Sequence, residues 1–110
     1  MEEESKFVKL LGNSPMIKVL DFLLVDREFD YSKKELSENS GISYNTLKSI
    51  LPYLVSNEII IKTRRIGKQD MFKLNTRNKY VKDMVLLFDS LIRHSAEDAK
   101  ERAKAVQMAE

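Results

Sequence analysis

Apolar residues recur at the three- to four-residue spacing of a helix in several stretches of the chain. The first clear stretch predicts a helix over residues 15–26, which we expect to be a core element. Ser14-Pro15 supports its start, because serine caps exposed backbone N–H groups and proline at the first helical position loses no needed donor. Residues 5–11 predict a shorter helix that stops at Gly12, a residue type common just after a helix end.

Two further helices are predicted on either side of a tight turn at Gly41. Ser32-Lys33-Lys34-Glu35 fits a capping box, so a short helix should run from there to about Asn39. Ser43 should cap the next helix, predicted over 44–57. Pro52 should kink that helix rather than end it, because one apolar stripe continues in phase through it, formed by Leu47, Ile50, Leu51 and Leu54.

Alternating and β-branched stretches predict short strands. Phe29-Asp30-Tyr31 alternates apolar and polar residues and predicts one short strand. Residues 59–65 and 70–74 predict a hairpin around a turn at 66–69. A long helix should follow, capped by Thr76 or Asn75, with a strong apolar face as far as Ile92. From Ser95 onward alanine, glutamate, lysine and arginine predominate, so the helix either continues to about Ala109 or gives way to a separate segment.

This order predicts an α+β fold, mainly α: a winged helix-turn-helix with a two-stranded wing and a long C-terminal helix. We expect residues 1–94 to form a winged-helix DNA-binding domain and residues 95–110 a helical extension. Several motifs support this reading, namely Gly12-Asn13-Ser14-Pro15, Val19-Leu20-Asp21-Phe22-Leu23, Phe29-Asp30-Tyr31-Ser32-Lys33, Gly41-Ile42-Ser43 with Thr46-Leu47, Leu51-Pro52-Tyr53-Leu54, and Thr63-Arg64-Arg65-Ile66-Gly67 with Phe72-Lys73-Leu74-Asn75.

Through these motifs, the stretch from Leu11 to Asn75 resembles archaeal winged-helix transcriptional regulators of the broad MarR/ArsR-like kind. The resemblance covers roughly 60% of the chain. It implies binding to duplex DNA, usually as a dimer.

Composition narrows the classes of function. The chain has 110 residues, 43% of them hydrophobic, which suits one folded domain. It has no cysteine and one histidine, and no glycine-rich phosphate-binding motif. We therefore expect no enzyme activity, no cofactor and no metal. Uninterrupted apolar runs such as Phe22 to Val25 are far too short to span a bilayer, and the chain begins with acidic residues, so we expect a cytoplasmic protein without a membrane partner.

Positive charge is concentrated in the middle third, where residues 43–79 carry a net charge of +6 against +2 for the whole chain. A recognition helix turns its N-terminal residues toward base edges in the major groove. In the predicted 44–57 helix, the residues near this end that lie outside the apolar stripe are Ser43, Tyr44, Asn45, Lys48 and Ser49. Asn45 could pair with adenine. Thr46 is either a further contact or a packing residue. The alternative to DNA contact by these residues is a polar helix face that is only exposed to solvent.

The predicted hairpin, residues 59–74, carries Lys62, Arg64, Arg65 and Lys68, with Gln69 at its turn. These residues suit a wing on phosphates or in the minor groove, although charge also protects an edge hairpin from pairing. Strand alternation places Lys62 and Arg64 on one face and Arg65 on the other. The helix start at Ser32, Lys33 and Lys34 either holds a DNA phosphate or is only a cap.

An approximate three- to four-residue repeat on the last helix predicts a homodimer, through Val85, Phe88, Ile92, Ala99, Ala103 and Val106. We expect one face of this helix in the core and the rest exchanged between two copies. The sequence thus predicts a sequence-specific, dimeric DNA-binding regulator with the 44–57 helix in the major groove. An architectural or partition protein that coats DNA, and a winged-helix protein–protein interaction module, are the alternatives.

Overall fold

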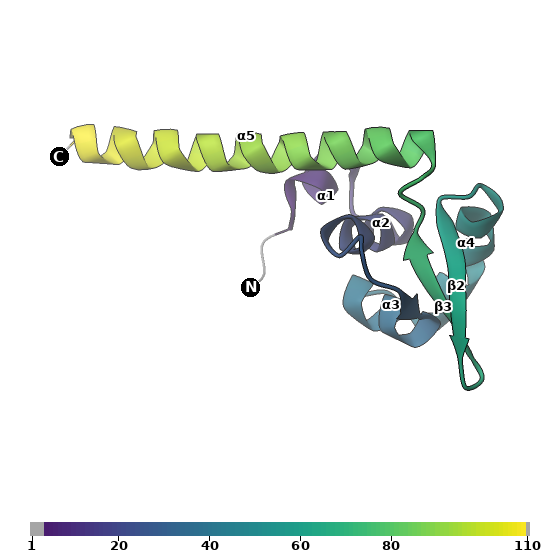
Figure 1. Cartoon of the computed structure of the whole chain (residues 1–110). Coiled ribbons are helices and arrows are strands. Elements are labelled where there is room, and N and C mark those ends of the chain that lie inside the picture. The colour runs from purple at the N-terminus through teal and green to yellow at the C-terminus, as the bar shows by residue number, and fades with distance from the viewer. Residues whose placement is uncertain (1–3, 110) are drawn as a thin grey trace.

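Serine caps fix where the first helices begin. The computed structural model describes residues 4–109 (Figure 1). Each hydroxyl oxygen of four cap serines accepts a hydrogen bond from a backbone N–H in the first turn. The corresponding helices are α1 (Lys6–Leu11), α2 (Pro15–Val25), α3 (Lys33–Ser40) and α4 (Tyr44–Ser56). These bounds agree with the predicted helices to within two residues.

The α3–α4 connection is a tight turn around Gly41. This residue adopts the left-handed conformation (φ +71°) that glycine reaches without steric cost. The helix α4 then runs without a break through Pro52, as the continuous apolar stripe predicts. Leu47, Leu51 and Leu54 on that stripe are buried, so the opposite face of α4 is left toward solvent.

The sheet has three strands, one more than the predicted wing. Its strands are β1 (Tyr31–Ser32), β2 (Ile60–Ile66) and β3 (Gln69–Leu74), in the order β1-β3-β2 and antiparallel. The strand predicted over 29–31 lies further along the chain, because Tyr31 and Ser32 are the residues that pair with β3. The Phe29 side chain is exposed. The hairpin turn is also narrower than predicted, since β2 and β3 extend to within two residues of each other.

One apolar core joins the helices to the sheet. Leu23 and Leu24 of α2 are fully buried, and so are residues from every neighbouring element, including Leu36, Leu47, Leu54, Ile60 and Leu74. The short helix α1 lies between α2 and the long last helix (Figure 1). This arrangement leaves the start of α4 and the hairpin turn at the end of the molecule farthest from that last helix.

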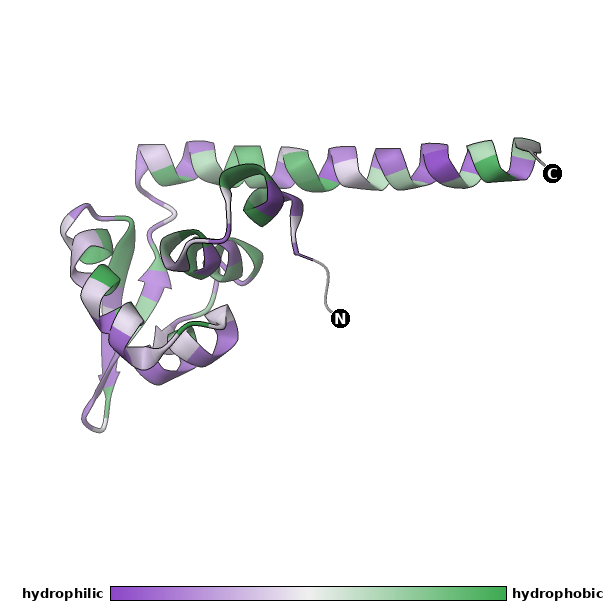
Figure 2. Cartoon of the chain, turned by 180° about the vertical axis from the view of Figure 1, so that it is seen from behind, coloured by the Kyte–Doolittle hydropathy of each residue, from purple (hydrophilic) through white to green (hydrophobic). Residues whose placement is uncertain are grey.

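The last helix, α5 (Lys79–Ala109), is continuous, so the extension beyond Ser95 is helical. The predicted caps Thr76 and Asn75 were wrong. Instead Asn78 caps the helix, because its Oδ1 accepts from the Tyr80 backbone N–H at 2.8 Å. The part of the chain before α5, residues 4–78, is here called the body, and it lies against only the first half of α5. The molecule reaches 60 Å in its longest dimension. Figure 2 shows hydrophobic segments recurring along α5 among hydrophilic ones. No helix within residues 4–109 is both long and apolar enough to cross a membrane.

Candidate nucleic-acid interface

The first turns of α4 present an exposed polar and aromatic surface. Tyr44, Asn45 and Lys48 are exposed, and the Lys48 ammonium lies 5.7 Å from the centre of the Tyr44 ring. Such a cation–aromatic contact holds both side chains on one side of the helix. The burial of Leu47 and Leu51 beneath fixes the orientation of this surface.

Three hydroxyl side chains at the same helix start bond within the helix. Ser43 Oγ accepts from the Thr46 backbone N–H, and the Ser43 hydroxyl donates to Thr46 Oγ1 at 2.7 Å. The Ser49 hydroxyl donates to the Thr46 carbonyl at 2.7 Å. Ser43 and Ser49 are exposed and Thr46 is half-buried. These bonds stiffen the helix start, whereas the Asn45 amide and the Lys48 ammonium keep their hydrogen-bond donors unused, as does the Tyr44 hydroxyl.

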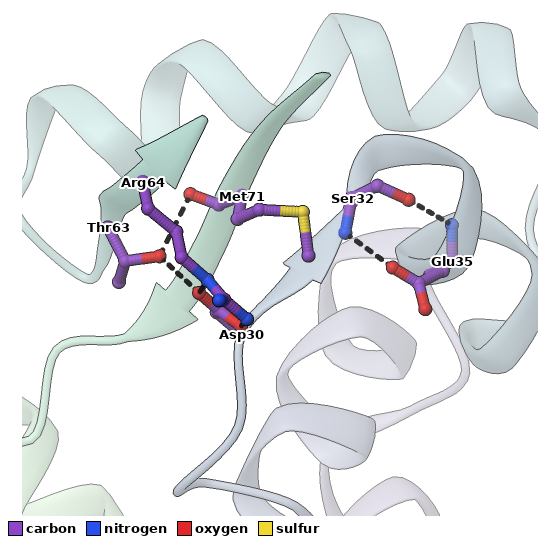
Figure 3. Close-up of polar contacts among 6 residues, drawn as sticks. All are labelled: Asp30, Ser32, Glu35, Thr63, Arg64 and Met71. Carbon is purple, nitrogen blue, oxygen red and sulfur yellow. Dashed lines mark hydrogen bonds and ion pairs between the residues drawn. The ribbon is translucent and has the colours of Figure 1, made fainter. Parts of the chain in front are cut away.

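The start of α3 carries the predicted capping box. Ser32 Oγ accepts from the Glu35 N–H at 3.2 Å, and a Glu35 carboxylate oxygen accepts from the Ser32 N–H at 2.9 Å (Figure 3). Ser32 is only 5% exposed, so its hydroxyl is occupied in capping α3. Of the two lysines that follow, Lys33 is half-buried and Lys34 is exposed.

The fold brings α3, α4 and the hairpin turn around one cleft of about 160 Å³. Its lining combines the α3 start with Tyr44 and the wing residues Lys68, Gln69 and Asp70. Lysines from both sides, Lys33 and Lys34 on α3 and Lys68 on the turn, give the cleft a surplus of positive charge. These three regions were predicted separately from the sequence, and only their packing shows that they line one cavity.

The hairpin contains a β-bulge that sequence alternation did not predict. Lys62 pairs with Phe72 and Arg65 with Asp70, so three steps along β2 match two along β3. Cross-strand partners share a face, and residues two apart on β3 share a face as well. Lys62 and Arg65 therefore lie on the face of Asp70, which lines the cleft. The Lys62 ammonium lies 3.4 Å from the Asp70 carboxylate. The predicted pairing of Lys62 with Arg64 on one face was wrong, because the extra residue of the bulge reverses the alternation.

Arg64 makes a two-pronged ion pair on the opposite side of the hairpin. Its Nε and Nη2 donate to the two carboxylate oxygens of Asp30 at 2.9 and 3.1 Å (Figure 3). The Thr63 hydroxyl donates to the same carboxylate at 2.6 Å. Hydrogen bonds from Arg64 and then Thr63 lower the pKa of Asp30 to about 2, and the same ion pair raises the pKa of Arg64. Asp30 was not among the predicted site residues, because no local pattern joins residues that lie 34 positions apart in the chain.

The predicted dimer residues of α5 fall into two groups. Phe88 is 3% exposed and packs edge to face on Phe7, with ring centres 5.7 Å apart, and Val85 is half-buried. Ile92, Ala99, Ala103 and Val106 are exposed. Phe88 thus belongs to the core of the chain itself, whereas the second group lies on the exposed surface of α5.

No metal-binding cluster of three or more histidine, aspartate or glutamate side chains occurs in the part of the chain that the structure describes. The single histidine, His94, lies on α5 with its Nδ1 3.6 Å from a Glu97 carboxylate oxygen. Both side chains are two-thirds exposed. The candidate interface itself carries cationic and hydrogen-bonding side chains, among them Lys34, Asn45 and Lys68.

Comparison with solved structures finds the same fold at low sequence identity. The adhesin competence repressor AdcR from Streptococcus pyogenes aligns with a TM-score of 0.55 and 14% identity, over 83% of this chain and 65% of its own. The DNA-binding protein Sso10a-2 from Sulfolobus solfataricus aligns with a TM-score of 0.51 and 17% identity, over 81% of this chain and 92% of its own.

The homodimeric winged helix-turn-helix DNA-binding domain of Mb0332 from Mycobacterium bovis aligns with a TM-score of 0.51 and 16% identity, over 84% of this chain and 91% of its own. No protein-family model matches the sequence, and neither does any curated protein. These similarities establish that the fold is a winged helix. This chain spans less than two thirds of the AdcR chain.

Proposed function

We propose that this protein binds double-stranded DNA as a dimeric transcriptional regulator. The observation that carries the proposal is the convergence of three cationic regions, the starts of α3 and α4 and the hairpin turn, on one side of a winged-helix fold. The solved proteins of similar fold include a repressor and two proteins described as DNA-binding. A cationic surface of this kind meets the phosphate backbone, which supplies most of the affinity for DNA.

In this proposal the first turns of α4 enter the major groove. A helix fits that groove, and its N-terminal side chains reach the base edges. Asn45 is the base-reading residue, because its exposed amide offers a donor and an acceptor to adenine. Lys48 and Tyr44 meet the adjacent backbone, and Ser43, Thr46 and Ser49 shape the helix start.

The cleft beside α4 is proposed to receive a backbone phosphate. Lys34 approaches it from the α3 start and Lys68 from the wing turn. The rest of the lining consists of Ser32, Lys33, Tyr44, Gln69 and the acidic Asp70. Phosphate contacts of this kind fix the register of a protein on the duplex without reading sequence. On the wing, Lys62 and Arg65 extend the same cationic face toward the next phosphates or the minor groove.

The exposed half of α5 is proposed to pair with a second copy. The face that packs on the body through Val81 and Phe88 continues at three- to four-residue steps beyond the body. There it presents Ile92, Ala99, Ala103 and Val106 to solvent. A second copy with the same exposed face would cover it in a two-fold arrangement. Such a dimer presents two copies of α4, which predicts a site with two half-sites.

The test is a selection from random-sequence duplex DNA, with binding repeated at low and at physiological salt. An enriched, two-fold symmetric motif that survives physiological salt supports a dimeric, site-specific regulator. The variant Lys68→Ala should weaken binding and lower the slope of log affinity against log salt by about 0.9, since one phosphate contact is lost. Its matched control is Lys104→Ala, at an exposed lysine near the far end of α5, which should leave both quantities unchanged.

Other outcomes would replace this proposal. Salt-sensitive binding without a motif indicates a protein that coats DNA, which uses the same surfaces with less base discrimination. No binding even at low salt contradicts a DNA-binding role. The cationic surface would then belong to a protein–protein interaction module.

A further inference from the structure

Asp30 joins the loop before the edge strand β1 to the far strand of the sheet. Its carboxylate accepts hydrogen bonds from two consecutive residues of β2, Thr63 and Arg64, and these three residues are here called the Asp30 cluster. The Asp30 side chain is 16% exposed, although it lies in a loop. Both oxygens accept from Arg64, which is the geometry of the stronger, directional ion pairs.

The Asp30 cluster coincides with the β-bulge. Thr63 and Arg64 are the two residues that lie opposite the single residue Met71 between the flanking pairs. Their side chains reach the same carboxylate, so both project from the same side of the hairpin (Figure 3). The Thr63 hydroxyl also lies 3.4 Å from the Met71 carbonyl oxygen. Asp30 therefore bonds to both side chains of the bulge.

The bulge decides where the wing cations point. With strict alternation, Arg65 would lie on the face opposite Lys62. With the extra residue, Lys62 and Arg65 share the face of Asp70, which borders the cleft between the wing turn, α3 and Tyr44. A bulge also bends its strand and increases the local twist, so it redirects the tip of the hairpin.

We propose that Asp30 is a positioning residue for DNA binding, which holds Thr63 and Arg64 so that Lys62 and Arg65 face the duplex. This inference rests on the proposed function. Asp30 and Arg64 do not touch the nucleic acid in this arrangement. Arg64 is a structural partner of Asp30, whereas the sequence pattern alone counted it among the DNA contacts.

The rival arrangement has Arg64 on a phosphate, with Asp30 as a nearby acid that weakens binding. The two arrangements predict opposite signs for Asp30→Ala. Removing an acidic side chain near DNA should strengthen binding in the rival arrangement, and the released Arg64 should steepen the salt dependence. If Asp30 positions the wing, the same substitution should weaken binding, because the wing cations lose their orientation.

The experiment measures binding of the full chain to random-sequence duplex DNA over a range of salt concentrations. Asp30→Ala and Arg64→Ala should each weaken binding, by roughly threefold to thirtyfold. The double variant should be little weaker than either single one, because both changes remove the same ion pair. Glu28→Ala is the matched control, since it removes an exposed carboxylate two residues away that is outside the cluster, and it should not weaken binding.

Hydrogen exchange of residues 60–74 gives a second readout that does not need DNA. Asp30→Ala should speed exchange in this hairpin while leaving α2 and α4 protected, which also shows that the variant is folded. Tighter binding of Asp30→Ala would overturn the inference and place Arg64 on a phosphate. If the wild-type chain binds no duplex at all, the proposed function fails. Unchanged exchange in the hairpin overturns the positioning role in either case.

Discussion

The ring of Phe7 meets the ring of Phe88 edge to face, with centres 5.7 Å apart and planes inclined by 65°. Both side chains are buried, at 1% and 3% exposure. The contact joins α1 near the start of the chain to α5, and α1 packs in turn on α2. Arg27, in the turn after α2, adds an ion pair to Asp89, with 2.7 Å between Nη2 and the nearer carboxylate oxygen. The Phe7–Phe88 contact and the Arg27–Asp89 ion pair therefore both attach α5 to the body.

Phe88→Ala should destabilise the protein by about 3–5 kcal/mol, because a large buried ring is lost and a cavity is left behind. Urea unfolding at one fixed protein concentration measures the change. Leu86→Ala, at a 67% exposed position of the same helix, is the control and should stay within about 0.5 kcal/mol. Equal effects of the two substitutions would contradict the placement of α5 on the body.

Asn78 serves both the start of α5 and the junction between α4 and β2. Its Oδ1 caps the helix, and its Nδ2 donates to the Glu58 carbonyl at 3.0 Å. Asn78→Ala removes both interactions and should cost about 1–2 kcal/mol in the free energy of unfolding. Asn78→Asp keeps the capping oxygen but loses the amide donor, so it should cost less. An alanine variant as stable as the wild type would show that another residue caps α5.

The carboxyl group of Asp30 should titrate with a midpoint near pH 2, followed by carbon-13 NMR of its side chain. Its pKa is lowered from the ordinary value of 3.8, so the contribution of this group to stability is fully present above about pH 4. That contribution is lost as the pH falls through about 2. Arg64→Ala should raise the midpoint toward 3.8, with part of the shift retained through Thr63. An unchanged midpoint in that variant would contradict the ion pair.

Asn45→Ala should relax the preference for one base pair, at a cost of about 1–3 kcal/mol for the preferred site. Lys48→Ala should instead weaken binding to all sequences and lower the salt slope by about 0.9. Binding to a set of single-base variants of the selected site separates the two effects. A uniform loss for Asn45→Ala would assign that residue to the backbone or to folding.

Val106→Glu should shift the protein from dimer toward monomer, because it places a charge on the proposed interface of α5. Met108→Glu is the matched control, since this exposed residue lies two positions further along, on another side of the helix. Light scattering over a range of protein concentrations gives the mass of each variant. The interface is refuted if both variants keep the mass of the wild type.

Local chemistry was sufficient to place most elements. Serine caps, the Ser32–Glu35 capping box and the Gly41 turn depend on a few neighbouring residues, and so their positions could be read from the chain. The predicted start of α5 was misplaced, because three polar residues near it can act as the cap, namely Asn75, Thr76 and Asn78. The choice depends on the Glu58 carbonyl oxygen, which accepts hydrogen bonds from the side-chain amides of Asn75 and Asn78.

The same distinction applies to the candidate site. Exposure of Tyr44, Asn45 and Lys48 follows from the apolar stripe of α4, which the sequence displays directly. The partner of Arg64 could not be predicted, because Asp30 is 34 residues away in the chain and meets it only when β1 joins the sheet. The bulge was equally hidden, since an extra residue in one strand is defined only by the register of its partner.

The sequence by itself determined the order of the helices and strands, their caps and the cationic middle third, because these depend on spacing and side-chain type. Tertiary structure decided which cations share a face and which are neutralised, how the α3 start meets the wing turn, and where the body stops covering α5. These properties depend on strand register and on packing between distant segments. Such long-range contacts leave no periodic signal in the chain.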